Sequence, residues 1–179
     1  MATTDIVDLF SPAARRERVV DWQAPGPAVR AAADMSGLEA MCAIRDGILP
    51  EPPMARLIDF RLRVAEPGRI VMELRPHESL ENTSGLLHGG TAATLLDTAM
   101  GCAISSMQPA GQTSVTLDLK LAYLRPLSVQ SGTIQAEGKV VKLGRQTSYA
   151  EGFVRDGAGN LAVHATATFS MIGEQARNR

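Results

Sequence analysis

The chain has 179 residues, of which 45% are hydrophobic, and a formal net charge of −1 at pH 7. This length suffices for one domain with a hydrophobic core, and the near-neutral charge gives no electrostatic case for binding nucleic acid or an anionic membrane surface. The two cysteines, Cys42 and Cys102, lie in apolar contexts without metal-ligand spacing. They indicate reduced thiols in a cytoplasmic protein. At the N-terminus acidic residues precede basic ones, the reverse of the order in a secretory signal.

The first part of the chain predicts little regular structure. Residues 1–35 contain three prolines and lack sustained periodicity, so we expect a partly ordered N-terminal extension with one short helix near residues 13–22. Ser36 is typical of a helix cap, and apolar residues then recur at helical spacing until Gly47. The proline-rich stretch 49–53 predicts an extended connection. We expect residues 36–172 to form one domain and residues 173–179 to form a tail.

The remaining pattern alternates between strand and helix periodicity. Apolar residues alternate with polar ones over 58–64, and residues 70–74 supply the hairpin partner after a Glu-Pro-Gly turn. A polar loop leads into a helix over 89–107. Four more strands are predicted, over residues 115–123, 131–143, 146–154 and 161–171. This order predicts an α+β domain in which one antiparallel sheet of about six strands wraps around a long central helix.

One acidic residue stands out in the central helix. Asp97 is the only charged residue between Gly89 and Met107. An ionised carboxylate among apolar side chains is costly to bury without partners. Such a group is therefore usually paired with another polar group or takes part in the protein's chemistry. The segment is long enough to cross a bilayer, but Asp97 and its serines, threonines and glycines make it a poor lipid-facing helix. We predict that Asp97 is a catalytic group; the alternative is a buried, hydrogen-bonded structural residue.

The sequence His88-Gly89-Gly90 stands where this helix begins. Free backbone N–H groups and the positive end of the helix dipole can bind an anion there or polarise a carbonyl oxygen. Asp97 lies eight residues beyond Gly89, which is about 12 Å along a helix. One helix therefore cannot bring both groups to one reacting atom. If Gly89 binds the carbonyl oxygen and Asp97 serves the attack, we predict an obligate dimer with two sites, each built from both subunits across a two-fold interface; the alternative is that the two glycines only form a tight corner between loop and helix.

A longer motif contains these residues. Asn82, Gly85, His88-Gly89-Gly90 and Asp97 together form N-x-x-G-x-x-H-G-G-x6-D. This motif resembles that of the hotdog-fold acyl-CoA thioesterases of the PaaI type, the phenylacetic-acid-degradation or 4-hydroxybenzoyl-CoA thioesterase-like group. The resemblance extends from about residue 38 to 172 and includes the stretches LPEPPMARLIDF and LKLAYLRPL. It implies the hotdog fold, which agrees with the predicted order of elements.

The resemblance also implies roles in the hydrolysis of acyl-CoA to a free acid and CoA. Asp97 would be the general base or the nucleophile, and the Gly89 N–H would bind the thioester oxygen. Asn82 would position the thioester or the attacking water, unless it is only a turn residue. His88 would orient the Asn82 loop or lie near the departing sulfur. Thr116 matches, with a one-residue shift, a hydroxyl that holds the water in some members.

Further residues are expected to bind the substrate, and several properties stay open. Gly90 lies beside the predicted oxyanion site, while Lys142, Gly144 and Arg145 form a turn like one that contacts the CoA nucleotide in the family. Arg125 can do the same. The resemblance implies no metal and no redox cofactor, and a dimer or a dimer of dimers. Two alternatives are a non-catalytic acyl-CoA-binding module and an enoyl-CoA hydratase. Nothing in the sequence selects an aromatic or aliphatic acyl group.

Overall fold

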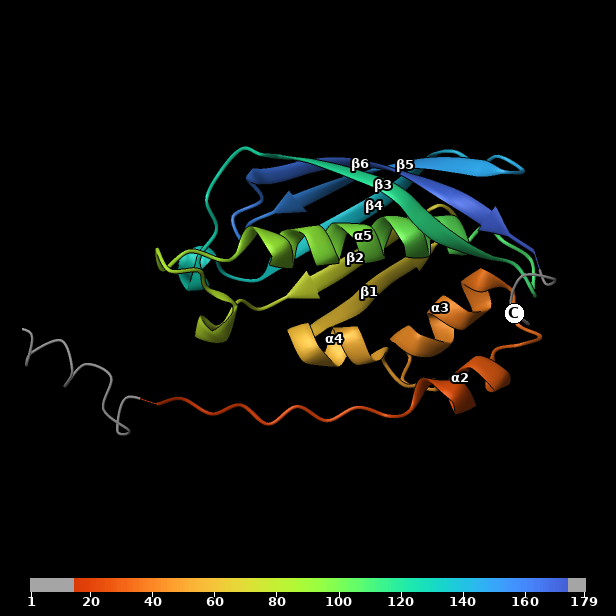
Figure 1. Ribbon diagram of the computed structural model, residues 1–179, viewed down its shortest axis with the longest axis horizontal. Helices are drawn as coiled ribbons and strands as arrows, with labels where there is room; N and C mark the ends of the chain where they lie inside the picture. The colour runs from red at the N-terminus through yellow and green to blue at the C-terminus, as the bar shows by residue number, and fades with distance from the viewer. Residues whose placement is uncertain (1–14, 174–179) are drawn as a thin grey trace, which may run out of the picture.

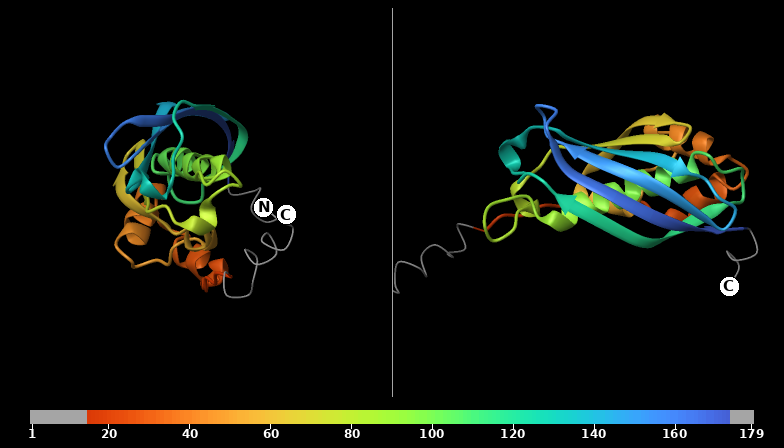
Figure 2. Two further views of the ribbon diagram at one scale, coloured as in Figure 1. Left: turned by 90° about the vertical axis from the view of Figure 1, so that its left-hand side faces the viewer. Right: turned by 90° about the horizontal axis from the view of Figure 1, so that it is seen from above.

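The computed structural model describes residues 15–173, and expectations for residues 1–14 and 174–179 lie outside this range. One antiparallel sheet in the order β1-β2-β4-β5-β6-β3 wraps around the helix α5 (Gly89–Ser105) (Figures 1 and 2). The strands are β1 (Phe60–Glu66), β2 (Arg69–Leu74), β3 (Thr113–Tyr123), β4 (Ile134–Lys142), β5 (Thr147–Arg155) and β6 (Leu161–Ile172). The smaller helices are α2 (Pro25–Ala31), α3 (Gly37–Arg45) and α4 (Pro53–Ile58). This confirms the predicted α+β architecture.

The central helix lies very close to the sheet. Gly138 of β4 and Gly152 of β5 are cross-strand partners directly beneath α5. A Cβ atom at Gly138 would overlap the backbone of Ala99, and one at Gly152 would lie 2.8 Å from a methyl carbon of Leu96. The sheet can therefore curve tightly around α5, whose Leu95, Leu96, Ala99 and Met100 are fully buried. No helix within residues 15–173 is long and apolar enough to cross a membrane.

The strand β3 forms one edge of the sheet. It pairs with β6 on one side only, and its register shifts between Thr116 and Asp118, where Leu117 bulges. Apolar side chains are exposed along it: Val115 is 47% exposed and Leu117 58%. A long edge strand with unpaired backbone groups and exposed apolar side chains is a surface on which another strand can pair.

The helix α3 is fastened to the end of α5. Its predicted cap is confirmed, because Ser36 Oγ accepts a hydrogen bond from the Glu39 N–H at 3.3 Å and the Glu39 carboxylate accepts one from the Ser36 N–H at 2.7 Å. The Gly37 N–H donates to the Gln108 carbonyl at 3.0 Å. A Cβ atom at Gly37 would overlap the Ser105 carbonyl oxygen. Glycine at this position lets α3 meet the last turn of α5.

Before the sheet, one sequence prediction is wrong and one holds only in part. The expected helix near residues 13–22 is absent from its described part, residues 15–22, which run extended along the domain to α2 (Figure 1). Those residues are almost all exposed, so no apolar face stabilises a helix there. The extended connection predicted over 49–53 ends one residue early, at Pro52. Because proline is well tolerated in the first turn of a helix, α4 begins at Pro53 and delays β1 to Phe60.

Candidate active site

The predicted catalytic acid lies in a groove between α5 and β3. The groove has a volume of about 370 Å³, and Asp97 lines it together with Gly101, Ser105 and Thr116. The Thr116 hydroxyl donates a hydrogen bond to Asp97 Oδ1 at 2.7 Å. Within residues 15–173 no other side chain bonds to this carboxylate, which leaves Oδ2 as a free acceptor. Asp97 is half-buried and is not enclosed in a network of structural hydrogen bonds.

Cys102 lines the same groove and is the other conceivable nucleophile there. Burial raises the pKa of its thiol from an ordinary value of 9.0 to about 12, and the negative charge of Asp97 adds to this effect. A cysteine attacks as its thiolate. Cys102 therefore stays protonated near neutral pH and does not compete with Asp97.

A second cleft, of about 310 Å³, lies at the start of α5. Asn82, His88, Gly89 and Arg125 line it. His88 caps the helix, since its Nδ1 accepts a hydrogen bond from the Gly90 N–H at 2.9 Å. In the neutral ring the proton then resides on Nε2. The Gly90 N–H, predicted to bind substrate, is thus occupied within the chain. The Gly89 N–H has no acceptor among the described residues.

Tyr123 fixes the peptide that carries this helix start. Its hydroxyl donates to the Gly89 carbonyl oxygen at 2.9 Å. A Cβ atom at Gly89 would lie 3.1 Å from the same hydroxyl oxygen, so a larger residue there would have to displace Tyr123 by a few tenths of an ångström. The sequence does not indicate this contact, because alternation along the strand marks Tyr123 only as a strand residue. No local spacing links it to Gly89, which lies 34 residues earlier.

Asn82 builds the loop before the helix. Its Oδ1 accepts hydrogen bonds from the Ser84 N–H at 2.8 Å and the Leu86 N–H at 3.2 Å. Its own backbone N–H donates to the Leu86 carbonyl at 2.7 Å. The turn role therefore exists, and it orients the side chain. The two Nδ2 hydrogens remain as donors beside the cleft.

The chain divides the predicted site residues into separate groups. Asp97 and Thr116 belong to the groove, whereas Asn82, His88 and Gly89 belong to the cleft at the start of α5. Eight helical residues, or about 12 Å, separate Asp97 from Gly89. The basic turn lines neither hollow; its Gly144 N–H donates to Ser148 Oγ at 3.1 Å. Within one chain the predicted site residues thus fall into two groups that do not meet.

Comparison with known proteins identifies the family. Residues 84–163 match the model of the Thioesterase superfamily. The proofreading thioesterase EntH of Klebsiella pneumoniae is 34% identical over 108 residues, covering 60% of this chain and 77% of EntH. The chain therefore belongs to the thioesterase superfamily.

Solved structures agree on the fold. The E. coli PaaI protein from the phenylacetic acid degradation operon superposes with a TM-score of 0.67 at 20% identity, over 79% of this chain and 96% of PaaI. A Streptococcus mutans protein bound to acetyl-CoA gives a TM-score of 0.59 at 27% identity, over 64% of this chain and 89% of that one. The hotdog fold is confirmed, and the family match confirms the predicted membership among the hotdog thioesterases.

Proposed function

We propose that this protein hydrolyses acyl-CoA thioesters to a free carboxylic acid and CoA, with Asp97 and Gly89 acting from two different subunits. The observation that carries the proposal is the Asp97 carboxylate, held by Thr116 at 2.7 Å in an accessible groove. The family supports thioester hydrolysis. The acetyl-CoA in the structure of the S. mutans protein supports CoA as the thiol.

The two half-sites supply the groups that this chemistry needs. As a general base, Asp97 accepts a proton from water while the water oxygen attacks the thioester carbon. As a nucleophile, Asp97 attacks that carbon itself, and water then hydrolyses the resulting anhydride. In both routes the carbonyl oxygen gains negative charge, which the Gly89 N–H stabilises. The C–S bond breaks, and the CoA sulfur takes up a proton.

A two-fold dimer through β3 would bring the half-sites together. The outer edge of β3 has no neighbour within residues 15–173, and Tyr123 at its end is 55% exposed. Antiparallel pairing of two β3 strands places the two α5 helices antiparallel and side by side. The start of one helix then lies beside the middle of the other, where its Gly89 faces the partner's Asp97. This arrangement gives two sites per dimer. Two such dimers can then associate into a tetramer.

The other predicted residues have supporting parts in this proposal. Asn82 offers its Nδ2 donors to the thioester or the water, and His88 offers Nε2–H near the sulfur. Arg125, in the same cleft, binds a CoA phosphate. Lys142 and Arg145 contact the CoA nucleotide from the β4–β5 turn. No step requires a metal or a redox cofactor.

A substrate panel tests the activity. Purified protein is mixed with acetyl-CoA, phenylacetyl-CoA, decanoyl-CoA and a 2-enoyl-CoA, and thiol release is followed with a thiol reagent. The proposal expects catalytic release from at least one saturated substrate. Loss of the enoyl absorbance without thiol release would instead identify a hydratase. Binding of CoA esters without any turnover would identify a non-catalytic module, and either result would overturn the proposal.

A further inference from the structure

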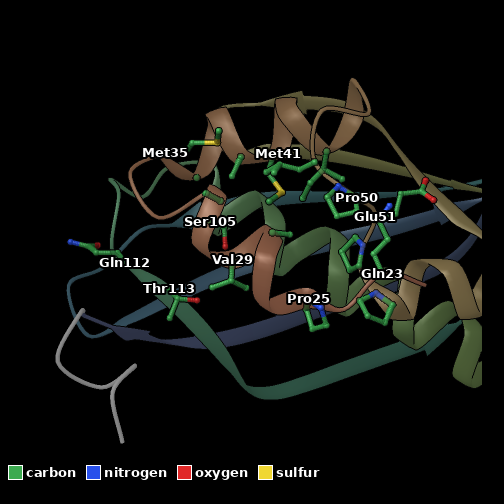
Figure 3. Close-up of a pocket in the computed structure, with 18 of the residues that line it drawn as sticks. Gln23, Pro25, Val29, Met35, Met41, Pro50, Glu51, Ser105, Gln112 and Thr113 are labelled. Carbon is green, nitrogen blue, oxygen red and sulfur yellow. The ribbon is translucent and has the colours of Figure 1, made fainter. Parts of the chain in front are cut away.

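A large apolar cavity lies beneath the N-terminal helix α2, between α2, α3 and the last turn of α5 (Figure 3). Its volume is about 560 Å³. Ala28, Val29 and Ala32 line it from the α2 side, and Met41 and Ile44 line it from α3. Its walls therefore consist mainly of hydrocarbon, which is the character of a site for an apolar ligand.

The cavity opens next to the predicted catalytic groove. Ser105 lines both hollows, and Thr113 of the cavity is followed directly by Ser114 of the groove. Asp97, Gly101 and Ser105 are spaced four residues apart, so they lie along one face of α5. Their side chains leave a shallow path along the helix, bordered by β3. This path leads from the Asp97 carboxylate to the cavity over about 12 Å of helix.

We propose that this cavity binds the apolar end of a straight acyl chain whose thioester lies at Asp97. The inference rests on the proposed thioesterase function and adds a substrate class to it. The acyl chain must span about 12 Å of helix from the thioester at Asp97 to Ser105. A carbon–carbon bond is about 1.5 Å long and a zigzag chain advances by less than that per bond, so roughly ten carbons are needed to reach Ser105. Acyl chains longer than this therefore enter the cavity, and shorter ones do not.

Charge in the wall favours an uncharged chain end. Glu51 is the charged residue of the cavity lining, and Arg56 approaches its carboxylate at 3.4 Å from the neighbouring helix α4. The Glu51 charge is thus already compensated, so no free cation among the described lining residues is left to pair with a carboxylate at the end of a substrate chain, which would lose its hydration in the apolar wall. The cavity thus selects simple acyl chains over dicarboxylic ones.

The proposal also explains how α2 is placed. This helix has seven residues and buries none of them fully, and Val29 is 49% exposed although it lines the cavity. A helix this short is unstable without packing partners. A bound hydrocarbon chain provides apolar contact beneath α2. The segment that precedes the hotdog domain then acts as one wall of the acyl site and determines chain-length specificity.

A matched pair of tryptophan substitutions on α2 tests this. Ala28→Trp fills the cavity, whereas Ala31→Trp places the same side chain on the exposed side of the helix, away from the cavity. Ala28→Trp is expected to lower kcat/KM for hexadecanoyl-CoA, whose chain extends past Ser105 into the cavity, about tenfold, as when two methylene groups lose their buried contacts. It leaves acetyl-CoA turnover unchanged, and Ala31→Trp changes neither. Equal effects of Ala28→Trp on both substrates, or none, would overturn the inference.

A binding measurement separates this inference from the activity. Hexadecanoate itself is titrated into the wild type and both variants by calorimetry, with circular dichroism to check folding. Binding to wild type and Ala31→Trp, weakened about tenfold in Ala28→Trp, supports the cavity even if no thioester is hydrolysed. Ala32→Leu, a smaller change at the same wall, replaces Ala28→Trp if that variant does not fold. No binding of hexadecanoate, or equal binding to all variants, would refute the proposal.

Discussion

Replacing Thr116 with valine removes a single hydrogen bond from the predicted catalytic carboxylate. The Thr116 hydroxyl lies 2.7 Å from Asp97 Oδ1, and valine keeps the side-chain shape without the donor. Hydrogen bonds to charged groups contribute about 1.5–3 kcal/mol. Because Asp97 is only half-buried, the lower end applies. If this contact orients Asp97 in the transition state, its loss lowers kcat about tenfold with little change in KM.

Two further variants isolate the effect of the hydroxyl. Thr116→Ser keeps the donor and is expected to retain most of the activity. Thr166→Val makes the same exchange on β6, between the buried Ala165 and Ala167 and thus on the outer face of the sheet. It should leave kcat unchanged. Steady-state thiol release from the best acyl-CoA gives kcat and KM for all variants. Wild-type turnover by Thr116→Val would refute the role of this contact.

Three other predictions follow from the structure. Asp97→Asn and Asn82→Ala chains, each inactive alone, should regain roughly a quarter of the wild-type activity when mixed. Random pairing makes half of the dimers mixed, and one of the two sites in each mixed dimer has both residues intact. No recovery of activity in verified heterodimers would exclude a shared site. Gly138→Ala should lower the free energy of unfolding by about 1–3 kcal/mol in urea titrations, because its Cβ overlaps the α5 backbone. Gly173→Ala is the control, since Gly173 has open space around it and the free energy of unfolding should not change. Burial raises the pKa of the Cys102 thiol from 9.0 to about 12. Its contribution to the free energy of unfolding is therefore complete below pH 9.0 and is lost as the pH rises toward 12. Between wild type and Cys102→Ala, the variant should lose less stability above pH 9.0, and parallel curves of stability against pH would contradict this.

Local patterns in the sequence predicted most of the hotdog domain. The period-two alternation in residues 58–64 and the apolar run after Gly89 specify elements whose burial repeats regularly along the chain. All six strands and α5 accordingly occur close to their predicted positions. The helix α4 was missed, because prolines at 52 and 53 suggest an extended chain, whereas the second of them starts a helix.

The site was predicted only in part, because its contacts join distant segments. Asp97 could be identified from a lone charge in an apolar helix. Its bond to Thr116 depends on the register of β3 and the bulge at Leu117, which no local pattern encodes. The contact of Tyr123 with Gly89 has the same origin. Such pairings follow from how the edge strand lies along α5, and they emerge only in the folded chain.

Thiol release by Asp97→Asn tests the central claim most directly. The substitution keeps the size of the side chain and its acceptor for the Thr116 hydroxyl, but removes the carboxylate that acts as base or nucleophile. We predict that kcat falls at least about a hundredfold, while circular dichroism and calorimetric binding of the acyl-CoA match the wild type. Turnover at the wild-type rate by the folded variant would contradict the account and place the chemistry elsewhere in the molecule.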